Sequence, residues 1–172
     1  MKFLKYVGIF ILFVVAAIFG MTLLAPDEVS FRVNYDINAP IERVYKATTN
    51  HTEFKHWISG VEATRQIEGE GVASGASYDL TFAGEGNMVM RHKAKVVEPN
   101  ARYAYMGTVK DFMEVSSDTK YIALDSANTR LTTKISMKTL SNKMKVFMYS
   151  KETHIKNATQ NYERLRDYLV NE

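Results

Sequence analysis

The stretch from residue 6 to residue 26 constrains this chain most, because its 21 residues include no lysine, arginine, aspartate or glutamate. It reads YVGIFILFVVAAIFGMTLLAP, with Lys5 before it and Asp27 after it. As a helix rising about 1.5 Å per residue, it spans roughly 30 Å, the thickness of the hydrocarbon core of a bilayer. The sequence therefore predicts a transmembrane anchor over residues 1–26 and a separate domain over residues 27–172.

Charges at the two ends of this segment predict its orientation. Lys2 and Lys5 precede it, whereas Asp27 and Glu28 follow it. The positive-inside rule then places the N-terminus in the cytoplasm and the domain outside it, in the periplasm of a Gram-negative cell. A cleaved signal peptide is the alternative, but cleavage after residue 20 or 25 leaves a large apolar residue three positions before the cut. We expect the single-pass anchor to be retained.

The rest of the chain has the charge balance of an ordinary globular domain. Two of the 22 basic residues lie in the anchor, so residues 27–172 carry 20 basic and 19 acidic residues. Nucleic-acid binding needs clustered lysine and arginine, so we expect no nucleic-acid partner. The absence of cysteine excludes disulfides and thiolate metal sites. The histidines lack the spacing of a metal site, so we predict no metal and no cofactor, and we expect a monomer.

Hydrophobic periodicity predicts an α+β domain with helices near its start and at its end. Residues 29–37 alternate apolar and polar side chains, as a half-buried strand does. Pro40 then suits the first turn of a helix, and a second short helix carries Trp57 inward. A long final helix is predicted over residues 141–170, which contain no glycine or proline. Six further strands are predicted over residues 61–67, 77–82, 87–97, 101–109, 112–124 and 129–137.

The segment Ile37-Asn38-Ala39-Pro40-Ile41-Glu42-Arg43-Val44-Tyr45 resembles the strand-to-helix entry of the START-related helix-grip superfamily, "I-x-A-P-x-x-x-V-[FWY]". Trp57, the glycine-rich turn at residues 69–75 and the final helix add to this resemblance, which covers about residues 29–171. The superfamily (SRPBCC) includes polyketide cyclase/dehydrase-type and lipid-transfer proteins. The resemblance implies a seven-stranded curved antiparallel sheet around the C-terminal helix, with a ligand cavity on the order of several hundred Å³ between them.

Candidate ligand contacts are the side chains that the predicted faces turn toward that cavity. Methionines line pockets for apolar ligands of variable shape, and tyrosines add one hydrogen-bonding tip to an apolar body. Packing in the core is the alternative for each of them. The candidates are Trp57, Tyr78, Leu80, Met88, Met90, His92, Tyr103, Tyr105, Phe147 and Ile155.

His92 is the one histidine on an apolar strand face, where it could serve as a general acid or base or simply be a buried, hydrogen-bonded residue. Glu114 is the acid nearest a possible inward face, but Met113 and Val115 form an equally good apolar face. No nucleophile elbow, phosphate loop, dinucleotide fingerprint or paired-acid motif is present, so no catalytic residue is assigned.

Three functions remain open. The first is binding, transport or sequestration of an apolar small molecule or lipid by a membrane-anchored domain. The second is a cyclase/dehydrase- or hydrolase-type enzyme that uses the same cavity, with His92 and a tyrosine. The third is an envelope interaction module with a filled core and no ligand. The volume and the lining of the space under the last helix discriminate between them.

Overall fold

The computed structural model describes residues 6–7, 9–14, 20, 25–84, 86 and 88–171, and of residues 143, 144, 146 and 147 the backbone only. Much of the predicted anchor, residues 1–5, 8, 15–19 and 21–24, therefore lies outside the described residues. Within the described part of the chain, no helix is both long enough and apolar enough to cross a bilayer.

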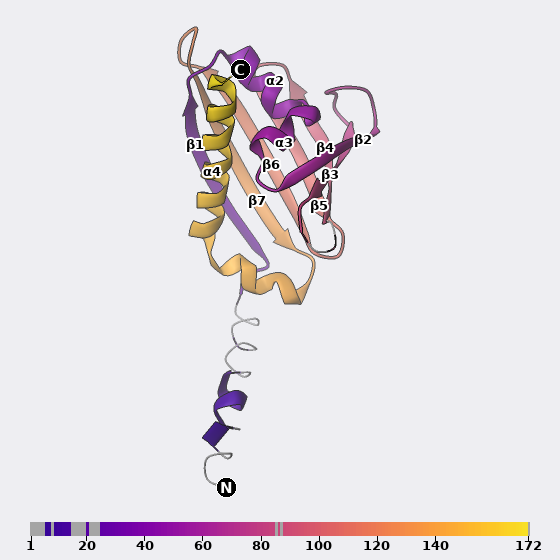
Figure 1. Ribbon diagram of the computed structural model, residues 1–172, viewed down its shortest axis with the longest axis vertical. Helices are drawn as coiled ribbons and strands as arrows, with labels where there is room; N and C mark the ends of the chain where they lie inside the picture. The colour runs from indigo at the N-terminus through magenta and orange to yellow at the C-terminus, as the bar shows by residue number, and fades with distance from the viewer. Residues whose placement is uncertain are drawn as a thin grey trace.

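Seven antiparallel strands form one strongly curved sheet, in the order β1-β7-β6-β5-β4-β3-β2 (Figure 1). Alternation of apolar and polar residues produces each strand, since successive side chains point to opposite faces. The sheet and the C-terminal helix confirm the predicted helix-grip architecture. The strands are β1 (Glu28–Ile37), β2 (Val61–Glu68), β3 (Ser77–Phe82), β4 (Val89–Glu98), β5 (Arg102–Val109), β6 (Met113–Ala123) and β7 (Thr129–Thr139).

Three short helical elements connect β1 to β2: α2 (Ile41–Thr49), η1 (His51–Glu53) and α3 (Phe54–Trp57). Pro40 precedes α2, where its missing N–H costs no hydrogen bond. The Asn50 side chain accepts a hydrogen bond from the backbone N–H of Thr52 and so caps η1. The indole N–H of Trp57 donates to the carbonyl of Ala47 at 3.0 Å, which ties α3 to α2.

The final helix begins later than the sequence predicts. Residues 141–170 were expected to form one helix, but α4 spans Lys151–Val170 and a 3₁₀ segment, η2 (Asn142–Tyr149), precedes it. Ser150 has a non-helical backbone, and its hydroxyl accepts a hydrogen bond from the N–H of Thr153 at 3.3 Å. Such an N-cap defines a helix start that apolar periodicity alone does not reveal.

Two separate clusters of buried side chains form the interior. The larger one lies where β1, β7 and α2 meet α4, and it includes Phe31, Val44, Leu131 and Leu165. The smaller one joins α3 to the strands at the other edge of the sheet, and its members are Phe54, Val61, Ala76, Tyr78 and Leu80. α4 crosses one side of the concave face and α3 the other (Figure 1). A single helix cannot cover the whole concave face of so bent a sheet. The buried side chains therefore form two clusters, one under α4 and one under α3.

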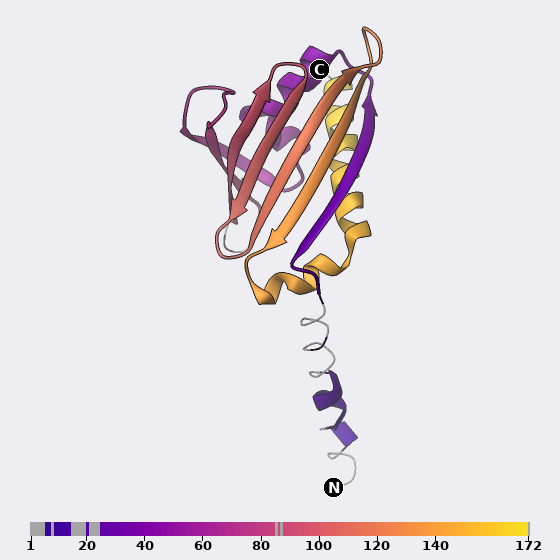
Figure 2. The ribbon, with the colours of Figure 1, turned by 180° about the vertical axis from the view of Figure 1, so that it is seen from behind.

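The opposite face of the sheet carries no described helix, as Figure 2 shows. Cross-strand ion pairs lie on this face, among them Arg102 with Asp118 at 2.7 Å and Arg130 with Asp36 at 2.6 Å. Successive residues of a strand therefore point alternately to this polar face and to the apolar concave face. This is the pattern of an antiparallel sheet that packs on one face and meets solvent on the other.

The chain enters the domain beside η2. The backbone carbonyl of Asp27 accepts a hydrogen bond from the N–H of Thr139 at 2.9 Å. The Asp27 carboxylate also forms an ion pair with Lys145 of η2 at 2.6 Å. The start of β1, the end of β7 and the segment that leads into α4 thus meet at one end of the sheet (Figure 1).

Candidate functional site

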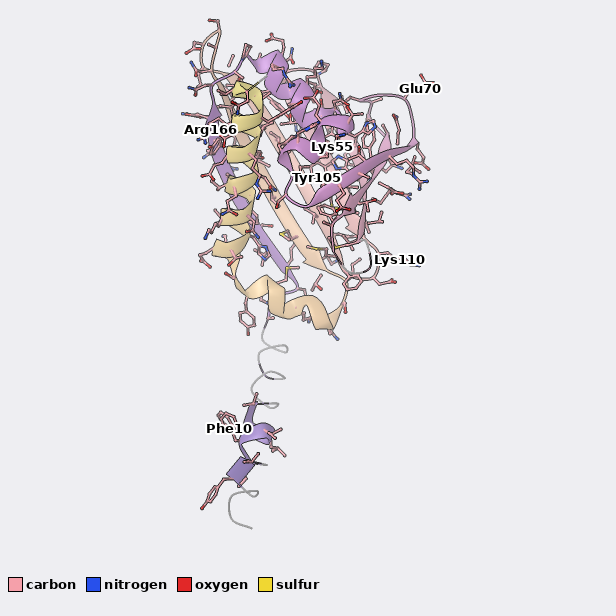
Figure 3. The ribbon with its side chains drawn as sticks, viewed as in Figure 1. Phe10, Lys55, Glu70, Tyr105, Lys110 and Arg166 are labelled. Carbon is pink, nitrogen blue, oxygen red and sulfur yellow. The ribbon has the colours of Figure 1, made fainter. Side chains whose placement is uncertain are left out.

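A cavity of about 340 Å³ lies between the two clusters, over the concave face of the sheet. Strands β3 to β7 form its floor, and α3 and α4 form its walls. Its volume lies at the lower end of the range for small-molecule sites. Tyr105 appears between α4 and α3 in Figure 3, whereas Glu70 and Lys110 lie on outer loops. The described lining residues are Thr48, Phe54, Trp57, Ile58, Ser59, Leu80, Phe82, Met88, Met90, His92, Tyr103, Tyr105, Val109, Met113, Val115, Ser117, Thr119, Tyr121, Ile135, Met137, Ala158, Asn161 and Tyr162.

Hydroxyl groups gather at the inner end of the cavity. Register places Thr133 beside Thr119 and Thr119 beside Tyr103, in one row across three strands. The Thr119 and Thr133 hydroxyls lie 3.0 Å apart, and the Tyr162 hydroxyl from α4 hydrogen-bonds to Thr133. Burial raises the pKa of Tyr162 to about 12, so this hydroxyl stays protonated.

A second hydroxyl pair lies beside this row. The Tyr121 hydroxyl is 2.7 Å from Oγ1 of Thr48. Oγ1 of Thr48 is also 2.9 Å from the carbonyl of Val44, which can only accept. Because the threonine has a single proton and gives it to that carbonyl, the Tyr121 hydroxyl donates to Thr48. Burial raises the pKa of Tyr121 well above its ordinary value, and the tyrosine remains neutral.

His92 lies on β4 and is 3% exposed. Its Nε2 is 2.9 Å from the hydroxyl of Tyr103, and its ring stacks on Tyr105 with the centroids 3.9 Å apart. Burial, and to a smaller extent the charge of His51, lowers the pKa of His92 to about 3. Burial also raises the pKa of Tyr103. Both partners are therefore uncharged at neutral pH.

The other end of the cavity is apolar. Met137 pairs with Val115, and Met113 pairs with Val109, along the ends of β5, β6 and β7 that lie nearest Asp27. Met90 pairs with Val109 in turn. The flexible thioethers can follow ligands of different outline. The cavity is thus polar at one end and apolar at the other.

The cavity opens between α4, the α3–β2 connection and the β3–β4 connection. Ser59 is exposed and Met88 is 48% exposed, and both also line the cavity. The backbone N–H of Ser59 donates to Oδ1 of Asn161 at 3.1 Å. This hydrogen bond joins the two sides of the opening, since Asn161 lies on α4.

The structure brings seven of the ten predicted contacts together around the cavity and places two elsewhere. Tyr78 is fully buried in the smaller cluster, where its hydroxyl donates to the carbonyl of Gly71 at 2.6 Å and its ring stacks on His51. Ile155 packs in the larger cluster instead. The side chain of Phe147 lies outside the described residues. The seven lining residues are Trp57, Leu80, Met88, Met90, His92, Tyr103 and Tyr105.

Sequence reasoning missed the polar lining of β6. Ser117 and Thr119 follow Met113 and Val115 at every second position, so all four share the inward face. Glu114 is therefore on the outer face, which resolves the ambiguous phase of this strand. The alternation was visible, but small polar residues on a predicted inward face gave no reason to prefer either phase.

No three His, Asp or Glu side chains converge as metal ligands within the residues that the structure describes. The described cavity lining also includes no lysine, arginine, aspartate or glutamate. What the arrangement offers chemically is a neutral, partly hydroxylated surface and one histidine–tyrosine pair.

Comparison with known proteins agrees with this fold. A family model described as "Activator of Hsp90 ATPase homolog 1-like protein" matches residues 38–170. No protein with a curated description matches the chain.

Many solved structures share the architecture. The chain is similar to Ara h 8.0201, with 17% identity, a TM-score of 0.66, and 84% of this chain and 99% of that chain covered. It is similar to the Zhui aromatase/cyclase from Streptomyces sp. R1128, with 12% identity, a TM-score of 0.67, and 83% and 93% covered. It is also similar to a START superfamily protein from Mycobacterium smegmatis, with 11% identity, a TM-score of 0.66, and 83% and 97% covered. At identities this low, the likeness is one of fold.

Proposed function

Because the chain belongs to the Activator of Hsp90 ATPase homolog 1-like family and has its helix-grip fold, we propose that it binds an apolar small molecule in the cavity between the sheet and α4. One observation carries this proposal: a space of about 340 Å³ remains inside the domain, and most of its lining is apolar. Protein interiors are otherwise close-packed, so an empty volume of this size loses contacts that a ligand restores.

Burial of apolar surface supplies the binding energy. Each Å² removed from water contributes about 25 cal/mol, so a ligand that hides roughly 200 Å² gains about 5 kcal/mol before the entropic cost of association. Trp57 from the α3 wall and Leu80 and Met90 from the floor offer such surface on one side of the cavity. The hydroxyl row then orients the ligand.

We further propose that residues 1–26 anchor the domain to a membrane, with the N-terminus in the cytoplasm and residues 27–172 outside it. The uncharged stretch between Lys5 and Asp27 supports the anchor, and the lysines before it support the orientation. A membrane tether would hold the cavity close to the bilayer, where apolar molecules concentrate.

Co-purification tests the binding proposal. Ala158 lines the cavity from α4, so Ala158→Phe fills part of the space, whereas Gln160→Phe puts the same ring on the exposed face of the same helix. The full chain is purified in lipid nanodiscs, extracted with organic solvent and analysed by mass spectrometry. We expect a species that is present with the wild type and Gln160→Phe and depleted with Ala158→Phe. The same extract from all three contradicts the proposal.

Cysteine labelling tests the anchor and its orientation. The chain has no cysteine, so Asp125→Cys in the exposed β6–β7 connection introduces a single thiol. We expect a membrane-impermeant maleimide to label this variant in cells whose outer membrane has been permeabilised, and the protein to remain in the membrane fraction. Labelling only after lysis contradicts the orientation, and recovery in the soluble fraction contradicts the anchor.

A second candidate function is catalysis by the His92–Tyr103 pair, which lies in the cavity with a 2.9 Å contact. A general base works best with a pKa near the operating pH, and the low pKa of His92 favours hydrogen bonding over proton abstraction. Extracts of His92→Gln test this function: accumulation of a compound with a different mass from the wild-type species supports turnover. Identical compounds in both extracts contradict it.

The interaction-module alternative requires a filled core. A cavity of about 340 Å³ argues against it, so ligand binding is the better supported reading.

A further inference from the structure

The inner end of the cavity combines hydrogen-bonding capacity with the absence of charge, and this restricts the ligand. Among the described lining residues, every polar side-chain group is a hydroxyl, an amide, the indole N–H of Trp57 or the neutral His92 ring. An ionised carboxylate or ammonium that entered would lose its hydration and meet no opposite charge, which is strongly unfavourable.

The hydroxyls of Thr119, Thr133 and Tyr162 contact one another. Oγ1 of Thr133 is hydrogen-bonded to both Thr119 and Tyr162, and Thr119 also hydrogen-bonds to the Tyr162 phenol. The three O–H protons are therefore satisfied within this cluster, whereas each oxygen keeps a lone pair. A ligand hydroxyl can donate to such a lone pair.

The neighbouring pair adds a second polar contact. The Tyr103 hydroxyl and Nε2 of His92 share one hydrogen bond, and register places Tyr103 directly beside Thr119. Oxygen lone pairs of Tyr103 and Thr119 are thus left to accept from a ligand hydroxyl. When Nε2 carries the ring proton of His92, the Tyr103 hydroxyl accepts it and keeps its own proton to donate, so a ligand hydroxyl or carbonyl oxygen has a partner here, next to the apolar part of the cavity.

The volume sets the size of the apolar body. A dry cavity of about 150 Å³ accommodates a single benzene ring. The cavity here has about 340 Å³, which suits about two rings or an equivalent segment of a longer chain. The opening at Ser59 and Met88 leaves room for such a chain to continue outward.

From the meeting of Thr119, Tyr103 and His92 in a charge-free cavity, we infer that the ligand is an uncharged molecule with an apolar body of about two rings and a hydroxyl or carbonyl oxygen. This oxygen lies against the Thr119–Tyr103 side of the cavity, and the apolar body extends toward Met113 and Met137. The inference rests on the proposed function and deepens it by naming the chemical class of the ligand.

Three matched probes test the class: decalin, 2-decalol and decalin-2-carboxylate at pH 8. All are saturated two-ring molecules, so binding to the full chain in nanodiscs can be followed by the fluorescence of Trp57, the one tryptophan of the chain and a lining residue. Nanodiscs with Ala158→Phe provide the blank. We expect 2-decalol to bind about fivefold tighter than decalin and at least about 100-fold tighter than the carboxylate.

Two variants test the position of the oxygen. Tyr103→Phe and Thr119→Val each remove one hydroxyl, and each should reduce the preference for 2-decalol over decalin to about twofold or less while the affinity for decalin is kept. Tyr35→Phe removes a hydroxyl that meets Arg166 outside the cavity, and should leave the preference unchanged. If either Tyr103→Phe or Thr119→Val fails to fold, the other variant still tests the position of the ligand oxygen.

The outcomes separate this inference from the proposed function. Binding of the carboxylate as tightly as 2-decalol overturns the uncharged class but leaves ligand binding standing. A preference for 2-decalol that survives both variants overturns the assigned position of the oxygen. Failure of all three probes, together with the absence of a co-purifying species, overturns the proposed function and this inference with it.

Discussion

The hydroxyl of Tyr103 and Nε2 of His92 lie 2.9 Å apart, inside a cavity where both side chains are at least nine-tenths buried. β4 and β5 supply one partner each, so the sheet itself fixes the contact. Burial keeps both groups neutral, and the stacked ring of Tyr105 covers the imidazole. The stability of the domain should therefore depend on the protonation of this one histidine.

Acid should weaken the fold through His92. Its pKa is about 3 in the folded chain and 6.5 ordinarily, so between these values the unfolded chain binds a proton that the folded chain does not. The stabilisation is fully present above pH 6.5 and is lost as the pH falls. The free energy of unfolding should fall by at most roughly 1.4 kcal/mol per pH unit in this interval. Urea unfolding of the wild type and His92→Gln at pH 5 and pH 7 measures it, and equal pH dependence in the two proteins refutes the prediction.

The contributions of the Thr119, Thr133 and Tyr162 hydroxyls to stability should be energetically coupled. Thr133→Val removes the hydroxyl that both Thr119 and Tyr162 contact, and should cost about 1–3 kcal/mol of stability. Adding Tyr162→Phe removes the phenol that has lost its Thr133 contact, so the double variant should be more stable than the sum of the two single losses predicts. Thermal and urea unfolding of all four proteins give the coupling. If the stability losses of Thr133→Val and Tyr162→Phe simply add in the double variant, the Thr133–Tyr162 hydrogen bond contributes nothing to stability.

The Ser59–Asn161 hydrogen bond should control the rate of ligand exchange. Asn161→Ala removes the acceptor on α4, frees one side of the opening, and should speed both association and dissociation of 2-decalol by a similar factor. The equilibrium affinity should change by no more than about twofold. Asn157→Ala, on an exposed position of the same helix, is the control. Stopped-flow fluorescence of Trp57 provides the rates, and unchanged rates with Asn161→Ala argue against a gate here.

Gly69 should tolerate a methyl group less well than Gly71. Both have a positive φ, 76° and 52°, in the turn between β2 and β3. A Cβ at Gly69 would lie 3.0 Å from the Cα of Ala76, whereas one at Gly71 meets nothing within 4 Å. Each alanine variant pays about 1–2 kcal/mol for the left-handed backbone, and Gly69→Ala should lose at least about 1 kcal/mol more. Urea midpoints of the two variants test the difference, and equal midpoints would contradict it.

The alternation of apolar and polar residues predicted most of the sheet, because this two-residue period can be recognised within each strand on its own. Leu131, Thr133 and Met137 alternate with charged and polar neighbours, and β7 forms where that alternation lies. The Pro40 entry and the final helix added the order of elements, from which the resemblance to helix-grip domains followed.

The start of α4 could not be predicted in the same way. Apolar residues continue through residues 141–149 at spacings that suit a helix, but a cap at Ser150 interrupts them. A cap depends on the backbone conformation of one residue, and the neighbouring serines and threonines offered no unique choice.

The candidate site was predicted only where the strand phase was clear. Met90 and His92 face the cavity because the first half of β4, up to Ala94, alternates regularly. Tyr78 lies on an equally regular strand, yet it does not line the cavity, because its hydroxyl donates to the carbonyl of Gly71 and its ring stacks on His51. Both partners come from connections between strands, so the alternation of β3 alone does not reveal these contacts.

The ion pair between Asp27 and Lys145 has a mechanical consequence. Asp27 is the first residue after the uncharged segment, and Lys145 belongs to the short piece of chain that leads into the helix over the cavity. A force exerted on the domain through its N-terminal end is therefore transmitted to both the first strand and that helix at once. An anchor at the N-terminal end of the chain would therefore also exert its load on α4, the helix that lines the cavity.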